Sequence, residues 1–317
     1  MSALLVNRPG LLTTVQDLGR WGFQSLGVPV AGPMDPFSHR WANALVGNDP
    51  RAATLEITLV GPDVTFEGER LVAVAGAEFE LTLDDQPVPA NVTVLARAGS
   101  HLRFGRRARG ARAYLAVAGG IAAPPTLGSR ATHVLSRMGG FFGRALASGD
   151  RVPLGQSSAE TVRLKPDPTR LVPRAIPDRH ARVRVLPGPQ RERLNDDALD
   201  LLQSAPYTIA NDSDRMGFHL QGPSLGHVRG ADMISDATPL GVLQVPASGQ
   251  PVLLMADRQT TGGYPAVATV ISADVGLAGQ LGPGDTISFL VCSRREALAA
   301  LIAQERTLMV VEGGCQS

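Results

Sequence analysis

Short apolar runs broken by glycine and proline are the dominant feature of this 317-residue sequence. Residues 71–88 show the pattern most clearly, because Phe79, Leu81 and Leu83 alternate with polar residues. Alternation with a period of two predicts a β-strand that buries one face. Five further runs have the same character, and they cover residues 111–121, 181–188, 250–257, 265–272 and 285–292.

Helices are few in this pattern. Asp35, Pro36 and Gly47 are the expected N-cap, first helical residue and end of one helix. A second helix is expected within 191–203, and a third begins at a capping box in residues 293–296. The sequence therefore predicts a mainly β fold with a few short helices, arranged as two antiparallel β-barrel subdomains.

The chain is longer than the size at which one hydrophobic core usually stops growing, so two domains are expected. Four prolines interrupt a polar stretch at 156–180, which we interpret as a connector. The expected subdomains are then residues 1–155 and 181–317.

A faint internal repeat supports two related halves. The pattern D-x-x-R-x-G-F occurs at 17–23 and again at 212–218. A Gly-Asp turn precedes an expected strand in each half, at 148–152 and 283–287. These short matches suggest that each half begins and ends with a similar structural motif.

The charge balance disfavours several classes of function. The 30 basic and 29 acidic residues give a net charge of +1, which argues against a nucleic-acid partner or an anionic membrane surface. Lys165 is the only lysine, so no phosphate-binding loop of the form G-x-x-x-x-G-K-[ST] can be written. A bound anion is therefore expected to be held by arginine and backbone N–H groups.

Other side-chain counts point to a soluble, cytoplasmic protein without a signal peptide. Cys292 and Cys315 form no C-x-x-C motif and do not indicate a disulfide framework. The sequence contains no run of 18 apolar residues and no charged segment before an apolar start. The six histidines include no H-x-x-x-H pair, so no metal site is expected, and each is interpreted as a surface or structural residue.

The densest cluster of reactive side chains is DRQTTGGYP at 257–265, between two expected strands. Positive φ angles at Gly262 and Gly263 would turn successive N–H groups into an anion-binding nest, beside the hydroxyls of Thr260 and Thr261. A turn that only reversed the chain needs the glycines and little else. We therefore predict a binding site at this turn.

Two charged residues open the same segment. Arg258 is a bidentate donor for a carboxylate or a phosphate, and Asp257 is an acceptor for a substrate amide or a base. The alternative is a plain hairpin turn, in which Asp257 and Thr260 bond their own backbone and Tyr264 packs on the barrel. The density of side-chain chemistry favours the binding site.

Polar residues elsewhere are further candidates. Arg20 and Gln24 can hold a carboxylate or an amide, although a structural ion pair is an equally good interpretation of Arg20. Arg215, in the second copy of the repeat, has the same two interpretations. Gln244 can present its amide to a ligand, whereas the loop after it is interpreted as a connection.

Two conspicuous motifs are interpreted as structural. Five arginines within 103–114 are expected at a solvated hairpin tip, with a docking surface for an acidic partner or nucleotide phosphates as the alternative. The sequence GPSLG at 222–226 matches G-x-S-x-G, but no helical pattern follows it. Ser224 is therefore not expected to be a nucleophile.

Motifs along nearly the whole chain resemble one family. They are TVQDLGRWGFQSLGVPVAGPMDPFSHRWAN, LEITLVGP, RAYLAVAGGI, SDRMGFHLQGP and GVLQVPASGQPVLLMADRQTTGGYPAVATV. Together they are similar to the allophanate hydrolase subunit 2 family, also labelled biotin-dependent carboxyltransferase, KipA or the C-type subunit of 5-oxoprolinase. The resemblance implies two cyclophilin-like β-barrel subdomains, and partner subunits of the KipI type and the LamB/YcsF type.

The resemblance also implies an activity, the ATP-dependent opening of the lactam 5-oxoproline to glutamate, with Mg²⁺ accompanying ATP. This protein and its KipI-type partner would phosphorylate the lactam oxygen, and the third subunit would complete hydrolysis. Such a transfer needs positive donors around the transferred group. The residues expected to act in catalysis are Arg20, Asp257, Arg258 and Tyr264. Those expected to bind substrate are Gln24, Arg215, Gln244, Gln259, Thr260, Thr261, Gly262 and Gly263.

Two alternatives stay open. The family includes the carboxyltransferase of urea carboxylase, which moves CO₂ from carboxybiotin to urea, a planar amide like the lactam. The chain carries no biotin-carrier segment and leaves no room for a biotin carboxylase, so both would have to be separate proteins. The second alternative is a regulator that binds a kinase inhibitor without turnover. GSRAT at 128–132 has alanine where the family usually shows serine, which leaves the substrate open.

Overall fold

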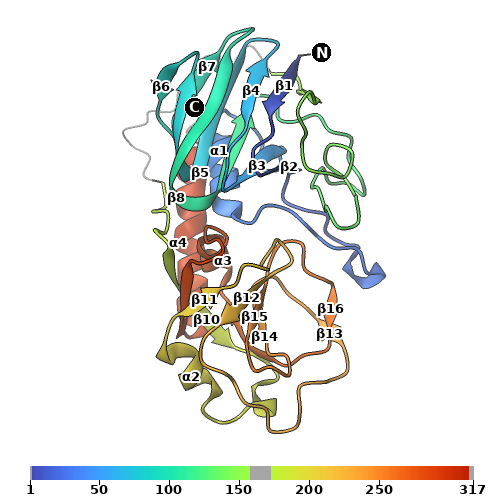
Figure 1. Cartoon of the computed structure of the whole chain (residues 1–317), viewed down its shortest axis with the longest axis vertical. Coiled ribbons are helices and arrows are strands. Elements are labelled where there is room, and N and C mark those ends of the chain that lie inside the picture. The colour runs from blue at the N-terminus through green and yellow to red at the C-terminus, as the bar shows by residue number, and fades with distance from the viewer. Residues whose placement is uncertain (1, 158–172, 314–317) are drawn as a thin grey trace. The chain divides into compact units, whose positions relative to one another are not determined.

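The computed structural model describes residues 2–157 and 173–313 (Figure 1). Most of the expected connector, including Lys165, lies outside these residues, as does Cys315. The chain divides into two compact units, whose boundaries depart from the expected subdomains in two places. The first unit consists of Met1–Arg20, Ala31–Ile176 and Arg306–Ser317, and the second of Trp21–Val30 and Pro177–Glu305. Sequence patterns show where a chain turns but not which distant segments pack together, so these two excursions were not predicted.

The first unit is built on a nine-stranded antiparallel sheet. Its strands are β1 (Ala3–Arg8), β2 (Leu12–Gln16), β3 (Thr54–Thr58), β4 (Asp63–Phe66), β5 (Arg70–Leu83), β6 (Gln86–Val88), β7 (Val94–Ala96), β8 (His101–Val117) and β9 (Arg151–Pro153). They follow the order β2-β3-β8-β4-β1-β9, and the long strand β5 joins this sheet through β8. Phe79 and Leu81 are buried and Glu80 is exposed, which confirms the alternation expected there.

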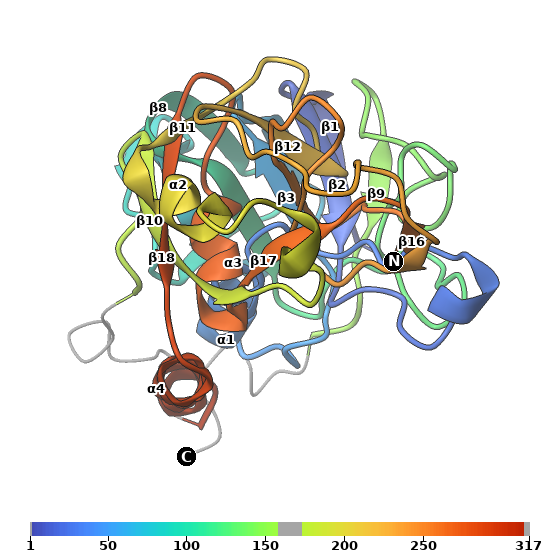
Figure 2. The ribbon, with the colours of Figure 1, turned by 90° about the horizontal axis from the view of Figure 1, so that it is seen from below.

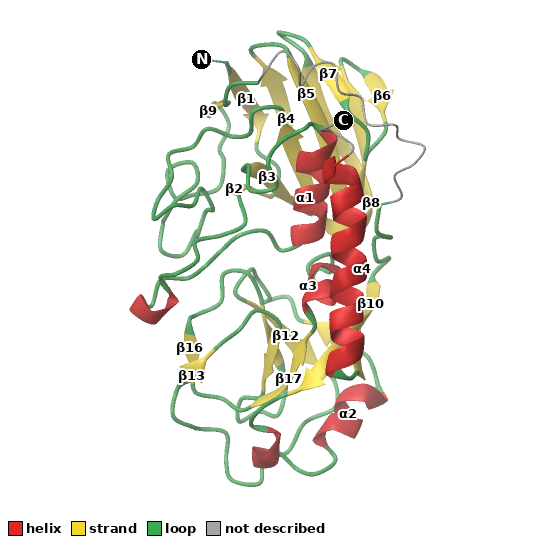
Figure 3. Ribbon diagram, turned by 180° about the vertical axis from the view of Figure 1, so that it is seen from behind, coloured by secondary structure: helices red, strands yellow, loops and turns green. Residues whose placement is uncertain are grey.

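Helix α1 (Pro36–Leu45) covers one face of this sheet (Figure 3). The side chain of Asp35 caps it by accepting from the Ser38 N–H at 3.2 Å, and Pro36 is the first helical residue, as expected. Trp41, 1% exposed, packs with apolar residues of β5 and β8. This packing fixes the helix on the sheet, because the free energy comes from burial of its apolar face.

Helix α4 (Arg294–Gly313) has 20 residues, so the expectation of only short helices was wrong. Figure 2 looks along its axis. The expected capping box is present, since Glu296 accepts from the Ser293 N–H at 2.7 Å and its own N–H donates to the Ser293 hydroxyl at 3.3 Å. Leu308 and Val311, near its end, join the apolar cluster of α1 in the first unit.

The second unit is a closed barrel in the strand order β10-β17-β14-β15-β12-β11-β18. These strands are β10 (His180–Pro187), β11 (Tyr207–Ile209), β12 (Gly217–Gln221), β14 (Val242–Gln244), β15 (Val252–Leu254), β17 (Ala266–Val270) and β18 (Thr286–Val291). Helices α2 (Ala198–Ser204) and α3 (Ser272–Ala278), the 3₁₀ turns η1 (Gln24–Leu26) and η3 (Arg191–Arg193), and the small pair β13 (Asp236–Ala237) and β16 (Thr261–Gly262) complete the unit. Strands β10 and β18 run parallel, so the barrel is not wholly antiparallel as expected.

Alternation along the barrel strands separates an inner face from an outer face. On β12, Phe218 and Leu220 are each 1% exposed, whereas His219 between them is exposed. His219 pairs in register with Val252 on β15, and Val252 pairs with Gln244 on β14. Because neighbouring strands lie about 5 Å apart, these three residues form one row across the outer face.

The segment 255–265 is not the hairpin turn that we expected. Strands β15 and β17, on either side of it, do not pair with each other, because each pairs antiparallel with β14 between them. The segment therefore runs past β14, from the end of β15 to the start of β17, where Ala266 pairs with Gln244. A crossover needs anchors along its length, and that accounts for part of the side-chain chemistry that the sequence concentrates there.

The Gly-Asp turn of the internal repeat has the same geometry in both units. Gly149 and Gly284 have φ of 86° and 81°, the left-handed region that favours glycine. The carboxylate of Asp150 accepts from the Ala147 N–H at 2.7 Å, and that of Asp285 from the Gly282 N–H at 2.9 Å. In the described part of the chain, no helix combines the length and the apolarity that crossing a membrane requires.

His39 in α1 provides a test of the packing of the first unit. Burial lowers the pKa of this side chain from 6.5 to about 4. Its Nε2 lies 3.2 Å from the Pro50 carbonyl, and its Nδ1 lies 2.9 Å from the Thr54 hydroxyl. Below pH 6.5 His39 of the unfolded chain binds a proton, whereas His39 of the folded chain stays neutral down to about pH 4. The free energy of unfolding therefore decreases as the pH falls from 6.5 to about 4.

We predict that the difference in unfolding free energy between the wild type and His39→Gln shrinks by about 2 kcal/mol between pH 7 and pH 5. Glutamine keeps a neutral polar group there and does not titrate. Urea denaturation followed by tryptophan fluorescence measures the difference, because Trp41 lies buried in the same helix. A difference in unfolding free energy that stays constant with pH would show that His39 is not held neutral.

Candidate functional site

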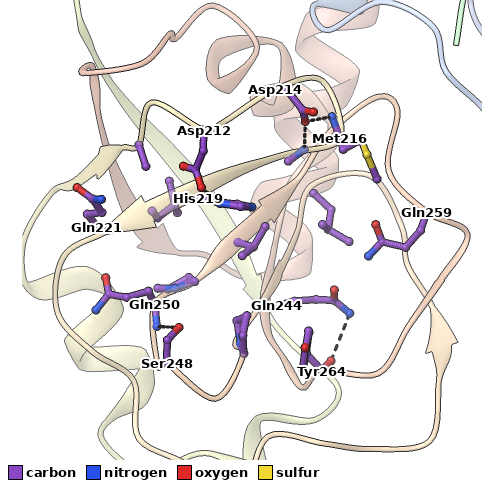
Figure 4. A pocket seen from close by; sticks show the side chains of 17 residues that line it. Asp212, Asp214, Met216, His219, Gln221, Gln244, Ser248, Gln250, Gln259 and Tyr264 are labelled. Carbon is purple, nitrogen blue, oxygen red and sulfur yellow. Dashed lines mark hydrogen bonds and ion pairs between the residues drawn. The ribbon is translucent and has the colours of Figure 1, made fainter. Parts of the chain in front are cut away.

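A cavity of about 610 Å³ lies on the outer face of the barrel in the second unit (Figure 4). Its apolar floor is formed by Val252 and Leu254, which pack with Val242 and Ala266 in a small cluster outside the barrel core. The floor follows from the strand alternation, since the neighbouring residue Leu253 points into the barrel and is fully buried. The volume falls within the range of sites for small organic ligands.

One side of the cavity carries neutral hydrogen-bonding groups. Gln244, Gln259 and Tyr264 lie in its wall, and all three are site residues that the sequence predicts (Figure 4). The Nε2 of Gln244 donates to the Tyr264 carbonyl at 3.3 Å, and no described residue donates to its Oε1. The Gln244 carboxamide therefore still offers its Oε1 as an acceptor and a second N–H of Nε2 as a donor to a ligand.

Gly262 lies directly behind Gln244. A Cβ atom at Gly262 would stand 2.6 Å from the Nε2 and 3.1 Å from the Oε1 of Gln244. The absence of a side chain at position 262 therefore lets the carboxamide occupy its place in the wall. This steric reason differs from the anion nest that we predicted for the two glycines.

The expected nest is absent. Gly262 and Gly263 are not among the residues with positive φ, and Thr261 and Gly262 form β16. Extended backbone points successive N–H groups in opposite directions, so they cannot converge on one anion. The carbonyls of Thr260 and Gly263 accept from the Thr238 N–H at 3.1 Å and the Met233 N–H at 2.9 Å. Thr260 and Thr261 do not line the cavity.

Arg215 and Asp257 form a buried ion pair behind the wall. The Nε and Nη2 of Arg215 each donate to one carboxylate oxygen of Asp257 at 2.9 Å. Both side chains are 6% exposed, and neither lines the cavity. Because the guanidinium occupies both oxygens, this geometry fits a structural role. It does not fit the base that we expected at Asp257 or the pocket residue that we expected at Arg215.

Arg258 is a buried cation of a different kind. It is 8% exposed, and its Nε donates to the Thr238 carbonyl at 2.8 Å. No carboxylate of the described residues pairs with it, and burial lowers its pKa to about 10. Arg258 does not line the cavity, but it directly precedes Gln259, which does. A desolvated charge without a counter-ion favours negative charge nearby.

Arg20 and Gln24 do not lie in this cavity. Arg20 belongs to the first unit, where it is fully buried and donates to the carbonyls of Thr126 at 3.2 Å and Ala131 at 2.7 Å. A catalytic role for Arg20 does not fit these bonds, which hold a loop. The Oε1 of Gln24 accepts from the Gly22 N–H at 2.7 Å. Ala131, where the family usually has serine, is buried in the first unit.

Sequence reasoning missed a histidine in the wall. The Nδ1 of His219 lies 2.7 Å from the Oδ2 of Asp212, and both residues line the cavity. The interpretation of every histidine as a surface or structural residue passed over this pair. A signal was present, because the alternation on β12 places His219 on the same face as Gln221, opposite the apolar residues.

The five arginines of 103–114 do not lie at a hairpin tip as expected, because they fall within the long strand β8, and Arg112 is buried. Arg106 pairs with Glu80 at 2.8 Å and Arg109 with Glu78 at 3.5 Å, across the long β5–β8 pair. No helix follows Ser224. No group of three or more histidine, cysteine, aspartate or glutamate residues suited to a metal ion occurs in the part of the chain that the structure covers.

Comparison with known proteins places this chain among two kinds of relative. It is 40% identical over 303 residues to the C-type subunit of the 5-oxoprolinase of Escherichia coli K12, and this match covers 96% of each chain. It is 33% identical to the urea amidolyase of Lachancea kluyveri, over 98% of this chain and 18% of that protein. The crystal structure of the K. lactis urea amidolyase matches with a TM-score of 0.91 at 32% identity, over 98% of this chain and 20% of that one.

A family profile matches as well. The profile described as carboxyltransferase domain, subdomain A and B, covers residues 26–291. The family resemblance of the sequence motifs is thereby confirmed. Since the profile spans most of the sequence and the relatives above span nearly all of it, the chain belongs to the carboxyltransferase domain family.

Proposed function

We propose that this chain is a subunit of an ATP-dependent 5-oxoprolinase, acting with a KipI-type and a LamB/YcsF-type subunit. The match to the C-type subunit of the E. coli 5-oxoprolinase carries the proposal, because it covers 96% of both chains, whereas the chain covers 18% of urea amidolyase.

The cavity chemistry supports a planar amide as the ligand. A lactam offers a flat apolar ring for the floor of Val252 and Leu254, a C=O acceptor and an N–H donor. Gln244 supplies a free acceptor and a further N–H at the edge of that floor, and Tyr264 adds a hydroxyl (Figure 4). Pockets of this kind use an apolar lining for affinity and a few polar groups for orientation.

Arg258 supports the transfer of a phosphoryl group. Negative charge develops on the lactam oxygen and the transferred phosphoryl group, and a positive charge in a water-poor wall stabilises both. No lysine-dependent phosphate loop can be written for this sequence. We propose that Arg258 acts through the electrostatic field and through its bond to Thr238, since it lies behind the wall. Mg²⁺ would arrive with ATP, whose phosphates supply its ligands.

Carboxyl transfer from a biotinylated carrier to urea is the second candidate. The observation in its favour is the TM-score of 0.91 to urea amidolyase. Urea is also a planar amide and fits the same groups. That reaction also needs a biotinylated carrier and a biotin carboxylase.

We expect Arg258→Met to lower 5-oxoproline-dependent ADP release by the assembled complex roughly 100-fold, the scale of losing one electrostatic stabiliser. Arg258→Lys is the matched control, because it keeps the charge and loses the planar fork; it should retain most of the activity. Steady-state ADP release with the partner subunits present measures both variants. Equal losses in both would show that Arg258 only holds the fold.

The same assay separates the candidate functions. A 5-oxoprolinase subunit supports ADP release when the lactam is added. A response to urea, bicarbonate and a biotinylated carrier, with none to 5-oxoproline, would replace the proposal with carboxyl transfer. Tight partner binding with no response to either amide would replace it with the regulatory role.

We predict that Gly262→Ala raises the KM for 5-oxoproline about ten-fold with little change in kcat, the scale of losing one hydrogen bond. The added Cβ would displace the Gln244 carboxamide from the wall. Gly263→Ala is the matched control, because its Cβ would meet only the Met233 carbonyl at 3.1 Å and the Ser235 hydroxyl at 3.7 Å. Equal KM values for both variants would show that Gln244 does not contact the substrate.

A further inference from the structure

We infer that His219, oriented by Asp212, is the base that removes the N–H proton of the amide bound in the cavity. The inference rests on the proposed function, and it adds a catalytic residue to it. Neither sequence motif nor charge pattern singles out this pair.

The geometry fixes the proton on one ring nitrogen. The Nδ1 of His219 lies 2.7 Å from a carboxylate oxygen of Asp212, which can only accept, so Nδ1 carries the hydrogen. The Nε2 is then left with its lone pair, which is the state of a general base. The backbone N–H of His219 donates to the Ser213 hydroxyl at 3.0 Å and fixes the start of the side chain.

The strand register places this base beside the expected amide. His219, Val252 and Gln244 form one row across β12, β15 and β14 on the outer face. By this register, a ligand on Val252 is flanked by Gln244 on one side and by His219 on the other. Figure 4 shows the side chains of Gln244 and His219 at different places around the pocket. In a five-membered lactam the C=O and N–H bonds diverge from adjacent ring atoms, so the oxygen can face Gln244 while the N–H faces His219.

The charged groups around His219 are few. Asp212, Asp214 and Tyr264 are the other titratable residues of the cavity wall. Asp214 is engaged by its own turn, where it accepts from the Met216 N–H at 2.7 Å. The neighbouring strands β11 and β15 carry no charged residue. Behind the wall, Arg215 and Asp257 neutralise each other, and Arg258 is the nearby cation.

The chemical step balances without another reagent. The Nε2 lone pair takes the lactam proton, and the N–H electrons become the second bond of a C=N group. The carbonyl oxygen then uses the released electron pair to bond the γ-phosphorus of ATP, and the bond from that phosphorus to ADP breaks. Carboxyl transfer to urea needs the same proton removal before nitrogen attacks the carboxyl carbon, so either reaction gives His219 this task.

The test uses the assembled complex and compares two histidines of one barrel. His219→Asn keeps a nitrogen donor for Asp212 and removes Nε2, and we expect it to lower kcat roughly 100-fold with little change in KM. His180→Asn is the control, because His180 is exposed, bonds the neutral hydroxyl of Thr286 at 2.9 Å and does not line the cavity. It should leave kcat unchanged.

The separate effects on kcat and KM identify the role. A base acts in the chemical step, so His219→Asn should lower kcat and leave KM nearly unchanged, whereas loss of a purely structural residue would raise KM as well. Asp212→Asn should also lower kcat, because the amide no longer offers the carboxylate that orients the His219 ring. Wild-type kcat in His219→Asn, or a loss that appears only in KM, would overturn the inference. A wild-type complex that turns over neither amide would instead overturn the proposed function, and the inference with it.

Discussion

The buried ion pair between Arg215 and Asp257 is the interaction on which this site depends. It ties the loop before β12 to the segment that crosses β14, two parts of the chain 42 residues apart. Removing one partner would leave a charge buried without compensation, which costs about 3 to 5 kcal/mol in proteins. The pair holds the crossover in place, and the crossover carries Gln259 and Tyr264 to the cavity.

From this anchor the site assembles in layers. The closed barrel supplies an outer face with an apolar floor, because alternate residues of β14 and β15 point away from the core. Gly262 leaves room for the Gln244 carboxamide, and among the described residues Arg258 lies behind the wall as a cation without a carboxylate partner. His219 and Asp212 stand across the floor from Gln244. Donors and acceptors for a neutral amide thus surround a flat surface, and a positive charge stands next to it.

Local structure was predictable from the sequence, and long-range placement was not. The alternation at 79–81, the cap at Asp35 and the turn before β18 depend on neighbouring residues, which is why they were confirmed. The hairpin at 257–265 was wrong because β14, which separates its flanking strands, comes earlier in the chain. For the same reason, the sequence did not reveal that Asp257 pairs with Arg215 or that His219 faces outward. Gln244, Gln259 and Tyr264 were named from their chemistry, and the structure brings these three together in one wall.

We propose that the amide binds on the outer face of the barrel. The most direct measurement is a crystal structure of the assembled complex with 5-oxoproline and a non-hydrolysable ATP analogue. We predict that the lactam lies on Val252, with its oxygen ~3 Å from the Gln244 carboxamide and its N–H directed at His219. A lactam bound in a partner protein or in the first unit, with this cavity unused, would contradict it.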